Sequence, residues 1–417
     1  MKKKSKLALP PIHNIGKEEI ALATKVLKSG PLSGFLASPG KKFLGGENVL
    51  KLEKAFAKKF KIKHAVSFNS ATTALQSAVA SLGIGPGDEV IVPPYTMSAS
   101  ATCVLLNGAV PIFADIDEKT LCIDSKSVLS KISSRTKAII SVNLLGQSAD
   151  YDELLILAKK HNLKIIEDNA QAPGAKYNGK YTGTIGDMGI FSFNIHKTIQ
   201  AGEGGMLVTN DDKIALRAQL VRNHGEVVVD TMSGYDAGPI IGSNYRMPEI
   251  IAAVMLAQLP RLDFLNRERV KLAKYLHKKI LGIKGIVPAH THKKNTHVYY
   301  RFALFINEKE LGLSRNSLIE AMSKEGFELS KGYVKPIYLL PVFKERKAFN
   351  NTHFPFEYEG YSAPEYKLGM CPVVERLYEK EFTLTDICQY PFTKKHVDLF
   401  VEALKKVIKN RDEKNTH

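Results

Sequence analysis

The residues most able to do chemistry are one lysine and one aspartate, each placed just after an apolar segment. Lys197 lies on a polar turn that follows residues 188–193 and is bounded by the glycine-rich stretch 202–205. Asp168 follows the apolar residues 163–166. A lysine amine can form a Schiff base with an aldehyde, and an aspartate can pair with a protonated ring nitrogen. Delivered into one crevice, the two groups are what pyridoxal phosphate chemistry needs.

From about residue 65 the hydrophobic pattern alternates between short strands and amphipathic helices. Strands are predicted at 65–68, 89–92, 110–114, 138–142, 164–166 and 205–209, and helices at 17–29, 49–60, 72–82, 151–161 and 213–221. This alternation favours an α/β fold in which helices cover both faces of a mostly parallel sheet. Ligands of such sheets bind at the carboxyl ends of the strands.

The second half of the chain predicts a further domain. A helical stretch, 248–281, is broken at Pro260 and leads toward it, and the polar, aromatic segment 344–370 is assigned no structure. Beyond the bridge we expect a strand at 299–306 and helices at 314–325 and 396–408. A chain of 417 residues exceeds the usual single-domain size. The predicted parts are an N-terminal helix and substrate-side loop (1–45), a large cofactor-binding domain (46–262) and a small C-terminal α/β domain (263–417).

Composition places the chain among soluble globular proteins, with 44% apolar and 24% charged residues. No apolar run is long enough for a membrane span, and residues 7–9 are too short for a signal sequence, so we expect a cytoplasmic protein. The net charge of +17 comes from lysines scattered through the predicted helices. We therefore expect neither a nucleic-acid nor a membrane partner, but some steering of anionic ligands. Four widely spaced cysteines indicate reduced thiols and no metal site.

A third candidate is the turn of small and hydroxyl residues at 69–75, between a predicted strand and a predicted helix. Its backbone N–H groups and the helix dipole would favour a phosphate. An ordinary N-cap, with Ser70 or Thr72 as the capping residue, explains the same pattern. Taken singly, Lys197, Asp168 and Ser192 are equally open to structural explanations, whereas their order and spacing together form a strong signal.

A series of short motifs carries a resemblance over nearly the whole chain. The motifs are Gly85-Pro86-Gly87-Asp88-Glu89-Val90, Phe113-Ala114-Asp115-Ile116-Asp117, Gly146-Gln147, Ile166-Glu167-Asp168-Asn169-Ala170-Gln171, Phe191-Ser192-Phe193, Gly202-Glu203-Gly204-Gly205, Arg222-Asn223-His224-Gly225 and Asn244-Tyr245-Arg246-Met247. In these blocks and their order the chain resembles the sugar aminotransferases of the DegT/StrS group, which are pyridoxal phosphate enzymes of fold type I. The resemblance implies that fold and a homodimer with active sites at the subunit interface.

The resemblance also implies roles for single residues. Lys197 matches the lysine that forms the Schiff base and acts as general base, and Asp168 matches the partner of the pyridinium nitrogen. Gln171 would lie near the ring hydroxyl.

For the cofactor's phosphate, the resemblance implies Ser192 and the turn at Ala71 and Thr72, with Thr73 as a further candidate. Asn244 would reach the phosphate site of the neighbouring subunit.

Four features depart from the family pattern or are less closely defined by it. Met97 stands where the family usually has an aromatic residue stacked on the cofactor ring, and a thioether can still pack there. Asn169 replaces a small residue. The loop 34–43 is longer than common and is expected near the entry of a sugar. Arg246 matches a residue with a structural or substrate-anion role.

The function predicted from the resemblance is transfer of an amino group from glutamate or glutamine to a keto sugar, nucleotide-linked, in deoxy-amino-sugar or surface polysaccharide biosynthesis. The alternatives are a sugar dehydratase, a cyclitol (inosose) aminotransferase and a non-catalytic regulatory relative. In the dehydratases a histidine replaces the lysine, and His196 is adjacent. Counting from Phe193 and back from Gly202 puts Lys197 in the lysine position, which favours transamination.

Overall fold

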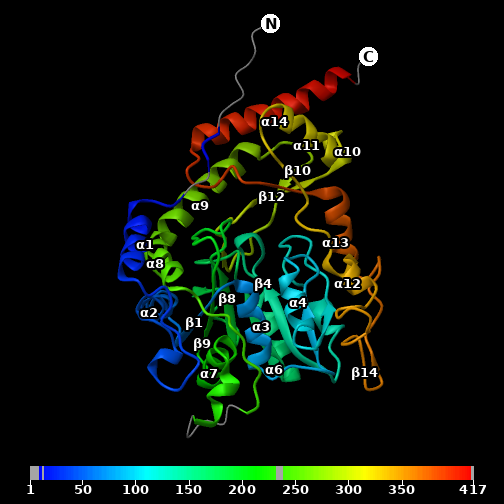
Figure 1. Cartoon of the computed structure of the whole chain (residues 1–417). Helices are drawn as coiled ribbons and strands as arrows, with labels where there is room; N and C mark the ends of the chain where they lie inside the picture. Colours follow the sequence, from blue (N-terminus) through cyan, green and yellow to red (C-terminus); the bar gives the residue numbers. More distant parts are fainter. Residues whose placement is uncertain (1–8, 12–13, 232–237, 415–417) are drawn as a thin grey trace.

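The computed structural model describes residues 9–11, 14–231 and 238–414, and a seven-stranded sheet lies at its centre (Figure 1). Across the sheet the strands are β1 (His64–Phe68), β9 (Gly205–Thr209), β8 (Met188–Ser192), β5 (Lys164–Asp168), β4 (Thr136–Val142), β2 (Glu89–Val92) and β3 (Val110–Phe113). Of these seven, β9 alone runs antiparallel to both neighbours. The mostly parallel sheet predicted from the sequence is therefore present, and the six strands predicted between residues 65 and 209 lie within two residues of their observed bounds.

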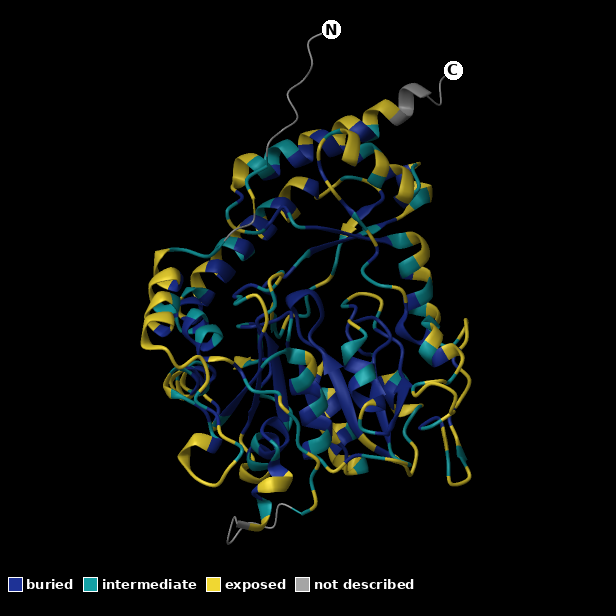
Figure 2. Ribbon diagram, in the orientation of Figure 1, coloured by how far each residue is buried: buried dark blue, intermediate teal, exposed yellow. Residues whose placement is uncertain are grey.

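Helices enclose this sheet and explain why its strands are apolar throughout. In Figure 2 the strands are dark blue, while the surrounding helices are yellow on their outer sides. Every residue of β2, β3 and β8 is buried, as expected for strands covered on both faces. The helices of this part are α1 (Lys17–Ser29), α2 (Glu47–Phe60), α3 (Ala71–Ser81), α4 (Ala99–Leu105), α5 (Ser125–Leu129), α6 (Tyr151–His161), α7 (Asp212–Arg222) and α8 (Glu249–Gln258).

A second sheet and a second core lie beyond helix α9 (Leu262–Ile280), which Figure 1 shows rising from α8 toward the top of the molecule. The break expected at Pro260 is a short 3₁₀ turn between α8 and α9. The sheet order is β10 (Ile286–Pro288), β12 (Phe302–Ile306), β16 (Phe382–Thr385) and β13 (Ser330–Lys331). Helices α10 (Glu308–Leu311), α11 (Arg315–Lys324) and α14 (Lys394–Lys414) complete this part.

Strand β12 begins three residues later than the predicted 299–306. Tyr299 has a positive φ of 48°, which a strand cannot contain. Its ring stacks on the His297 ring at 3.9 Å between centroids. Tyr299 therefore packs on the core of the small sheet and does not pair within that sheet.

The segment 344–370, which was assigned no structure, follows α12 (Pro341–Lys344) and contains the hairpin β14 (Glu357–Tyr358) and β15 (Tyr361–Ser362). Its Phe356 and Tyr366 are buried in the core of the large sheet, and Tyr366 donates a hydrogen bond to the carbonyl of Pro111 at 2.9 Å. Helix α13 (Pro372–Arg376) follows. The predicted boundary at residue 263 remains a prediction, and this C-terminal segment packs on the large sheet.

Sequence periodicity also missed a small three-stranded sheet, because its strands have only two residues each. Their order is β11 (Asn295–Thr296), β6 (Lys176–Tyr177) and β7 (Lys180–Tyr181). This sheet joins the segment before β12 to the large domain.

The loop 34–43 is fixed to the large domain by two residues that follow each other at the end of α7. The Asn223 side-chain amide donates to the carbonyls of Leu36 and Phe43, and the Arg222 guanidinium lies 4.8 Å from the Phe35 ring centroid. Loop residues do not line the cavity described below. A role of this loop in substrate entry therefore remains a prediction.

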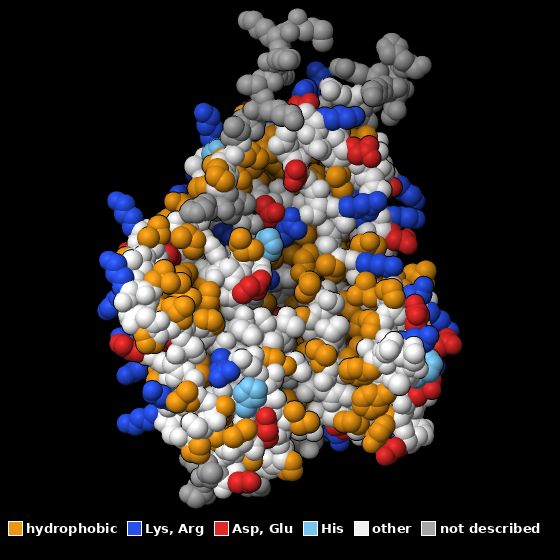
Figure 3. Space-filling model, viewed as in Figure 1, with side chains coloured by type: hydrophobic (Ala, Val, Ile, Leu, Met, Phe, Trp, Pro, Cys, Tyr) orange, Lys and Arg blue, Asp and Glu red, His pale blue; other side chains and the backbone are white. Residues whose placement is uncertain are grey.

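Charged side chains are spread over the surface. On the face shown in Figure 3, lysine and arginine side chains are scattered around the outline and do not gather in one stripe. Within the described ranges, no helix is both long and apolar enough to cross a membrane.

A buried ion pair holds α2, β1 and α7 together, and its removal should destabilise the fold. The Arg222 guanidinium is fully buried and lies 2.6 Å from the Glu53 carboxylate, which also accepts from the N–H and hydroxyl of Ser67. Breaking a buried pair leaves an uncompensated charge, so Arg222→Met should lower the free energy of unfolding by about 3–5 kcal/mol. Denaturant unfolding of the purified variants measures this.

The matched control is Lys51→Met, which removes a cation from the exposed Lys51–Glu47 pair. Exposed pairs contribute little to stability, so Lys51→Met should shift the unfolding midpoint far less than Arg222→Met. Equal unfolding midpoints for the two variants would show that the buried pair contributes no more to stability than the exposed pair.

Candidate active site

The carboxyl ends of the parallel strands deliver the predicted reactive groups to one cavity of about 880 Å³. Asp168 is the last residue of β5 and Ser192 the last of β8, and these two strands pair in parallel with Asp168 opposite Ile190. Lys197 follows on the turn after β8. Asp168, Ser192 and Lys197 all line the cavity, so the structure brings together what the sequence predicted to meet.

The turn after β8 presents Lys197 through its own backbone hydrogen bonds. The Lys197 N–H donates to the carbonyl of Asn194 at 2.9 Å, and the N–H groups of Phe193 and Ile195 pair with the carbonyls of Gly204 and Gly202. The Lys197 ammonium nitrogen lies 4.9 Å from the Tyr300 ring centroid. Burial lowers the pKa of the Lys197 amine, and the charge of Asp168 partly opposes this. A lowered pKa increases the fraction of uncharged amine, which is the nucleophilic and basic form.

Asp168 is a carboxylate kept in a largely dry environment. Its side chain is 5% exposed, and burial raises the pKa of the carboxyl group. The Ser100 hydroxyl donates to Oδ2 at 2.7 Å and the Ala170 N–H to Oδ1 at 3.2 Å, and both bonds lower the pKa, as does the charge of Lys197. A carboxylate held in this way can stabilise a cationic ring nitrogen next to it.

The adjacent Glu167 holds the end of β5 in place. It is fully buried, and its carboxylate accepts hydrogen bonds from the N–H groups of Gly183, Ile185 and Gly186 at 2.5–2.7 Å. These bonds tie β5 to the loop that leads into β8. Asp168 and the turn bearing Lys197 are therefore kept in register.

The strand-to-helix turn at Ser70 has the geometry of an anion site. Ser70 is extended, and its hydroxyl accepts from the Thr73 N–H at 3.1 Å as the N-cap of α3. The N–H groups of Ala71 and Thr72 begin the helix and have no acceptor within it. A Cβ on Gly205 would lie 2.5 Å from the carbonyl of Ser70, so only glycine lets β9 pack this closely on the turn. The N-cap is therefore present, and the same geometry leaves the N–H groups of Ala71 and Thr72 free of acceptors within the helix, so the anion site stays a prediction.

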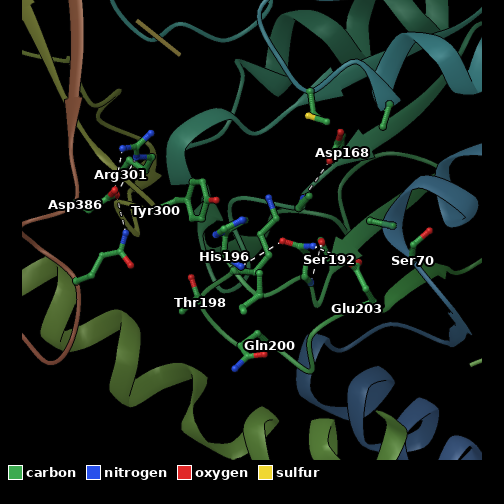
Figure 4. Close-up of a pocket in the computed structure, with 18 of the residues that line it drawn as sticks. Ser70, Asp168, Ser192, His196, Thr198, Gln200, Glu203, Tyr300, Arg301 and Asp386 are labelled. Atoms are coloured by element: carbon green, nitrogen blue, oxygen red, sulfur yellow. Dashed lines mark hydrogen bonds and ion pairs between the residues drawn. The ribbon is translucent and has the colours of Figure 1, made fainter. Parts of the chain in front are cut away.

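These features fit pyridoxal phosphate. The helix terminus and Ser192 would hold the phosphate, Asp168 would face the ring nitrogen, and Lys197 would bond to the aldehyde. Figure 4 shows Ser70, Ser192 and Asp168 toward one end of the cavity, and Tyr300, Arg301 and Asp386 at the other.

The family model of the DegT/DnrJ/EryC1/StrS aminotransferases matches residues 15–375. The chain belongs to this family. It is 40% identical over 299 residues to the GDP-perosamine synthase of Caulobacter vibrioides, covering 72% of this chain and 79% of that protein. It is 35% identical over 347 residues to the spore coat polysaccharide biosynthesis protein SpsC of Bacillus subtilis, covering 82% and 86%.

Among solved structures, the Spr1654 protein of Streptococcus pneumoniae in its PLP form superposes with a TM-score of 0.77 at 26% identity, covering 95% of this chain and 97% of that one. The predicted fold type I and the predicted cofactor are thus confirmed. This DegT/DnrJ/EryC1/StrS protein is a pyridoxal phosphate-dependent aminotransferase.

The remaining predicted site residues of this aminotransferase differ in where they lie. Met97 lines the cavity and is 59% exposed, as a residue that packs on a ring should be. Thr73 turns away, because its hydroxyl donates to the Asn69 side chain at 2.7 Å and to the carbonyl of Ser70 at 3.0 Å. Gln171 is buried behind Tyr333, to whose hydroxyl it donates at 2.7 Å. Their roles remain predictions.

Asn244 and Arg246 lie outside the cavity of their own chain. Arg246 donates to the Asn244 side-chain oxygen at 2.7 Å, and Asn244 pairs with Asn223 in an isolated bridge. His196 lines the cavity but is exposed, whereas Lys197 is partly buried. The structure therefore gives Lys197, not His196, the sheltered position.

Sequence reasoning missed the whole side of the cavity that the C-terminal half supplies. Most of these residues lie in loops with no periodic pattern. One signal was present: Arg269 is a charged residue in the apolar stripe of α9, among Leu262, Leu265, Leu272 and Leu276, all of which are buried. The missed lining residues on this side are Leu265, Arg269, Tyr300, Arg301, Tyr333, Val334, Asp386, Gln389 and Tyr390.

Asp168→Asn should weaken cofactor binding without weakening the fold. Because the folded pKa of Asp168 is raised, its favourable contribution to stability is complete only below the unfolded pKa and is lost as the pH rises through the folded one. At pH 7 the amide removes the desolvation penalty of the ionised carboxylate, so the unfolding free energy of the apoenzyme should not fall. Loss of a charged hydrogen bond should weaken cofactor affinity by about 10- to 100-fold.

Absorbance titration with the cofactor measures the affinity, and denaturant unfolding measures the stability. Asp115→Asn is the matched control, because burial also raises the pKa of Asp115, which does not line the cavity. Unchanged cofactor affinity in Asp168→Asn would contradict the pairing with the ring nitrogen.

Proposed function

We propose that this aminotransferase transfers an amino group from glutamate or glutamine to the ketone of a nucleotide-linked deoxysugar, in amino-sugar or surface polysaccharide biosynthesis. The observation that carries the proposal is the placement of a partly buried Lys197 amine and a buried Asp168 carboxylate in one cavity with a helix N-terminus. The cavity volume, about 880 Å³, is in the upper range of small-molecule sites. It has room for a cofactor and a sugar together.

The names of the relatives support the substrate class. The Caulobacter vibrioides protein is a GDP-perosamine synthase, and the Bacillus subtilis protein belongs to spore coat polysaccharide biosynthesis. The net charge of +17 supports an anionic substrate carrier such as a nucleoside diphosphate. We propose a 4-keto or 3-keto sugar as the acceptor.

The chain's own residues supply binding and proton transfer. Bound pyridoxal phosphate supplies an aldehyde that carries the amino group and a ring that withdraws electrons from the reacting carbon. Lys197, in its uncharged form, would take the proton from the α-carbon of the donor and return one to the sugar carbon in the opposite half-reaction. Asp168 would keep the ring nitrogen protonated. Tyr300, whose ring faces the Lys197 amine, would limit where that amine can move.

The test is a panel of keto sugars offered to the enzyme with glutamate as donor. We expect amination of nucleotide-linked keto sugars and none of the free sugars. Lys197→Ala should abolish turnover, and borohydride should fix the cofactor's mass on Lys197 in the wild-type chain, as mass spectrometry of peptides would show. Efficient use of a free inosose alone would make the enzyme a cyclitol aminotransferase. Release of a hydroxyl without amination would make it a dehydratase.

We further propose that the enzyme is a homodimer with shared sites, in the cytoplasm. Asn244 supports this because it is exposed and lies outside its own cavity, while Arg246 orients its side chain. In a dimer it would complete the phosphate site of the second copy.

Mixing Lys197→Ala chains with Asn244→Ala chains tests the shared site. Each single variant should be nearly inactive, but a mixed dimer contains one undamaged site, so activity should return to about a quarter of the wild-type value per total chain when the exchange is random. Subunit exchange is measured separately, by native mass spectrometry of the mixture when the two variants carry tags of different mass. Subunit exchange without any recovery would show that Asn244 does not act across the interface.

A further inference from the structure

Arg269 is a buried cation inside the active-site cavity. It lies on α9, is 5% exposed, and lines the same cavity as Lys197. Its Nη1 donates a hydrogen bond at 2.8 Å to the hydroxyl of Thr198, the residue directly after Lys197. Consecutive Cα atoms are about 3.8 Å apart, so the guanidinium contacts the chain immediately next to the reactive lysine.

Within the described residues the Arg269 guanidinium has no carboxylate partner. Arg269 forms no ion pair with a described residue, and its buried Nε has no hydrogen-bond acceptor there. Asp386 is near enough to affect its pKa, but both Asp386 oxygens are used by Arg301 at 2.8 Å, and one also accepts from Gln389. Burial lowers the pKa of Arg269 to about 10, which leaves it charged at neutral pH.

The two other buried arginines among the described residues have more partners than Arg269. Arg222 pairs with the Glu53 carboxylate and with two backbone carbonyls. Arg315 donates to the carbonyls of Tyr378, Glu379 and Phe382. A buried charge without such partners is destabilising. Arg269 therefore has unused hydrogen-bonding capacity that an arriving anion could use.

The position of Arg269 indicates which anion it could bind. It contacts the segment beyond Lys197, and Tyr300, whose ring faces the Lys197 amine, is close enough to affect the pKa of Arg269. Figure 4 shows Tyr300 on the side of the cavity away from Ser70, where the phosphate would bind. An α-amino acid carries its carboxylate on the same carbon as the amino group. A cation that binds this carboxylate must lie beside the amine that is exchanged.

We propose that Arg269 binds the α-carboxylate of the amino donor, and that its bond to Thr198 orients the guanidinium for this. The inference rests on the proposed transamination. Arg301 is the other arginine of the cavity, but its two bonds to Asp386 already neutralise it. The geometry of an arginine fork matches a carboxylate, which can accept two parallel N–H bonds.

The test compares each donor with its α-carboxamide, in the donor half-reaction alone. Transfer of the amino group to the bound cofactor changes its absorbance, so no sugar is needed. The wild-type enzyme should use L-glutamate with a kcat/KM about 10- to 100-fold above that of L-isoglutamine, the α-amide. In Arg269→Met the value for glutamate should fall by about the same factor, while the value for isoglutamine should stay within about twofold of wild type.

Three further variants separate binding from folding. Arg267→Met removes an exposed arginine from the same helix and should leave kcat/KM unchanged for both glutamate and isoglutamine. Arg269→Lys keeps the charge and should restore part of the preference for glutamate. Thr198→Val removes the orienting bond and should weaken glutamate use by less than Arg269→Met does. Calorimetric binding of 2-methylglutamate, which has no α-proton to transfer, gives a readout without turnover and should weaken about 10- to 100-fold in Arg269→Met.

If Arg269→Met lowers kcat/KM equally for glutamate and isoglutamine, and Thr198→Val lowers both by the same factor, then Arg269 only supports the Lys197 turn. That result would overturn the inference. Unchanged binding of 2-methylglutamate would overturn it as well. If no amino acid transfers its amino group to the cofactor of the wild-type enzyme, that result would instead overturn the proposed transamination, on which the inference rests.

Discussion

The desolvation of two opposite charges, Asp168 and Lys197, is the constraint on which the rest of the site depends. Burial disfavours the ionised form of each group and moves their pKa values toward one another. Each charge partly offsets the penalty on the other. A fold that buries Asp168 at the end of β5 and Lys197 on the turn after the neighbouring β8 gives up stability to hold these groups in one cavity, as is general for active sites.

The surroundings of these groups are correspondingly rigid. Glu167 holds the loop that leads into β8 by three backbone N–H bonds, and Ser100 fixes the orientation of the Asp168 carboxylate. The close approach of Gly205 to the carbonyl of Ser70 leaves no space for a side chain between β9 and the turn before α3. Displacing a catalytic group by about 1 Å can lower the reaction rate by about 100-fold. The residue types around Asp168 and Lys197 are therefore constrained by the available space and hydrogen bonds, just as Asp168 and Lys197 are constrained by the chemistry proposed for them.

The large sheet and the strand-end residues could be predicted because both depend on local pattern. Continuous apolar strands such as 188–192 and 205–209 are typical of a sheet covered on both faces, and parallel strands place their carboxyl ends at one edge. The late start of β12 could not be predicted, because the apolar pattern of 299–306 does not reveal the positive φ of Tyr299. The packing of Phe356 and Tyr366 on the large sheet was likewise hidden, since their segment has no periodicity. Contacts between distant segments leave little trace in a single sequence.

The same reasoning separates the two sides of the cavity. Asp168 and Ser192 end β5 and β8, and Lys197 lies on the turn after β8, so the topology of the sheet brings the three together. Tyr300, Arg301 and Asp386 come from the C-terminal half and meet the first group only through tertiary packing. The two sides therefore depend on different contacts. The strand-end side holds the groups proposed to bind the cofactor, and the C-terminal side surrounds the space proposed for a donor or a sugar. Changes on the C-terminal side can therefore alter substrate preference while the strand-end groups stay in place.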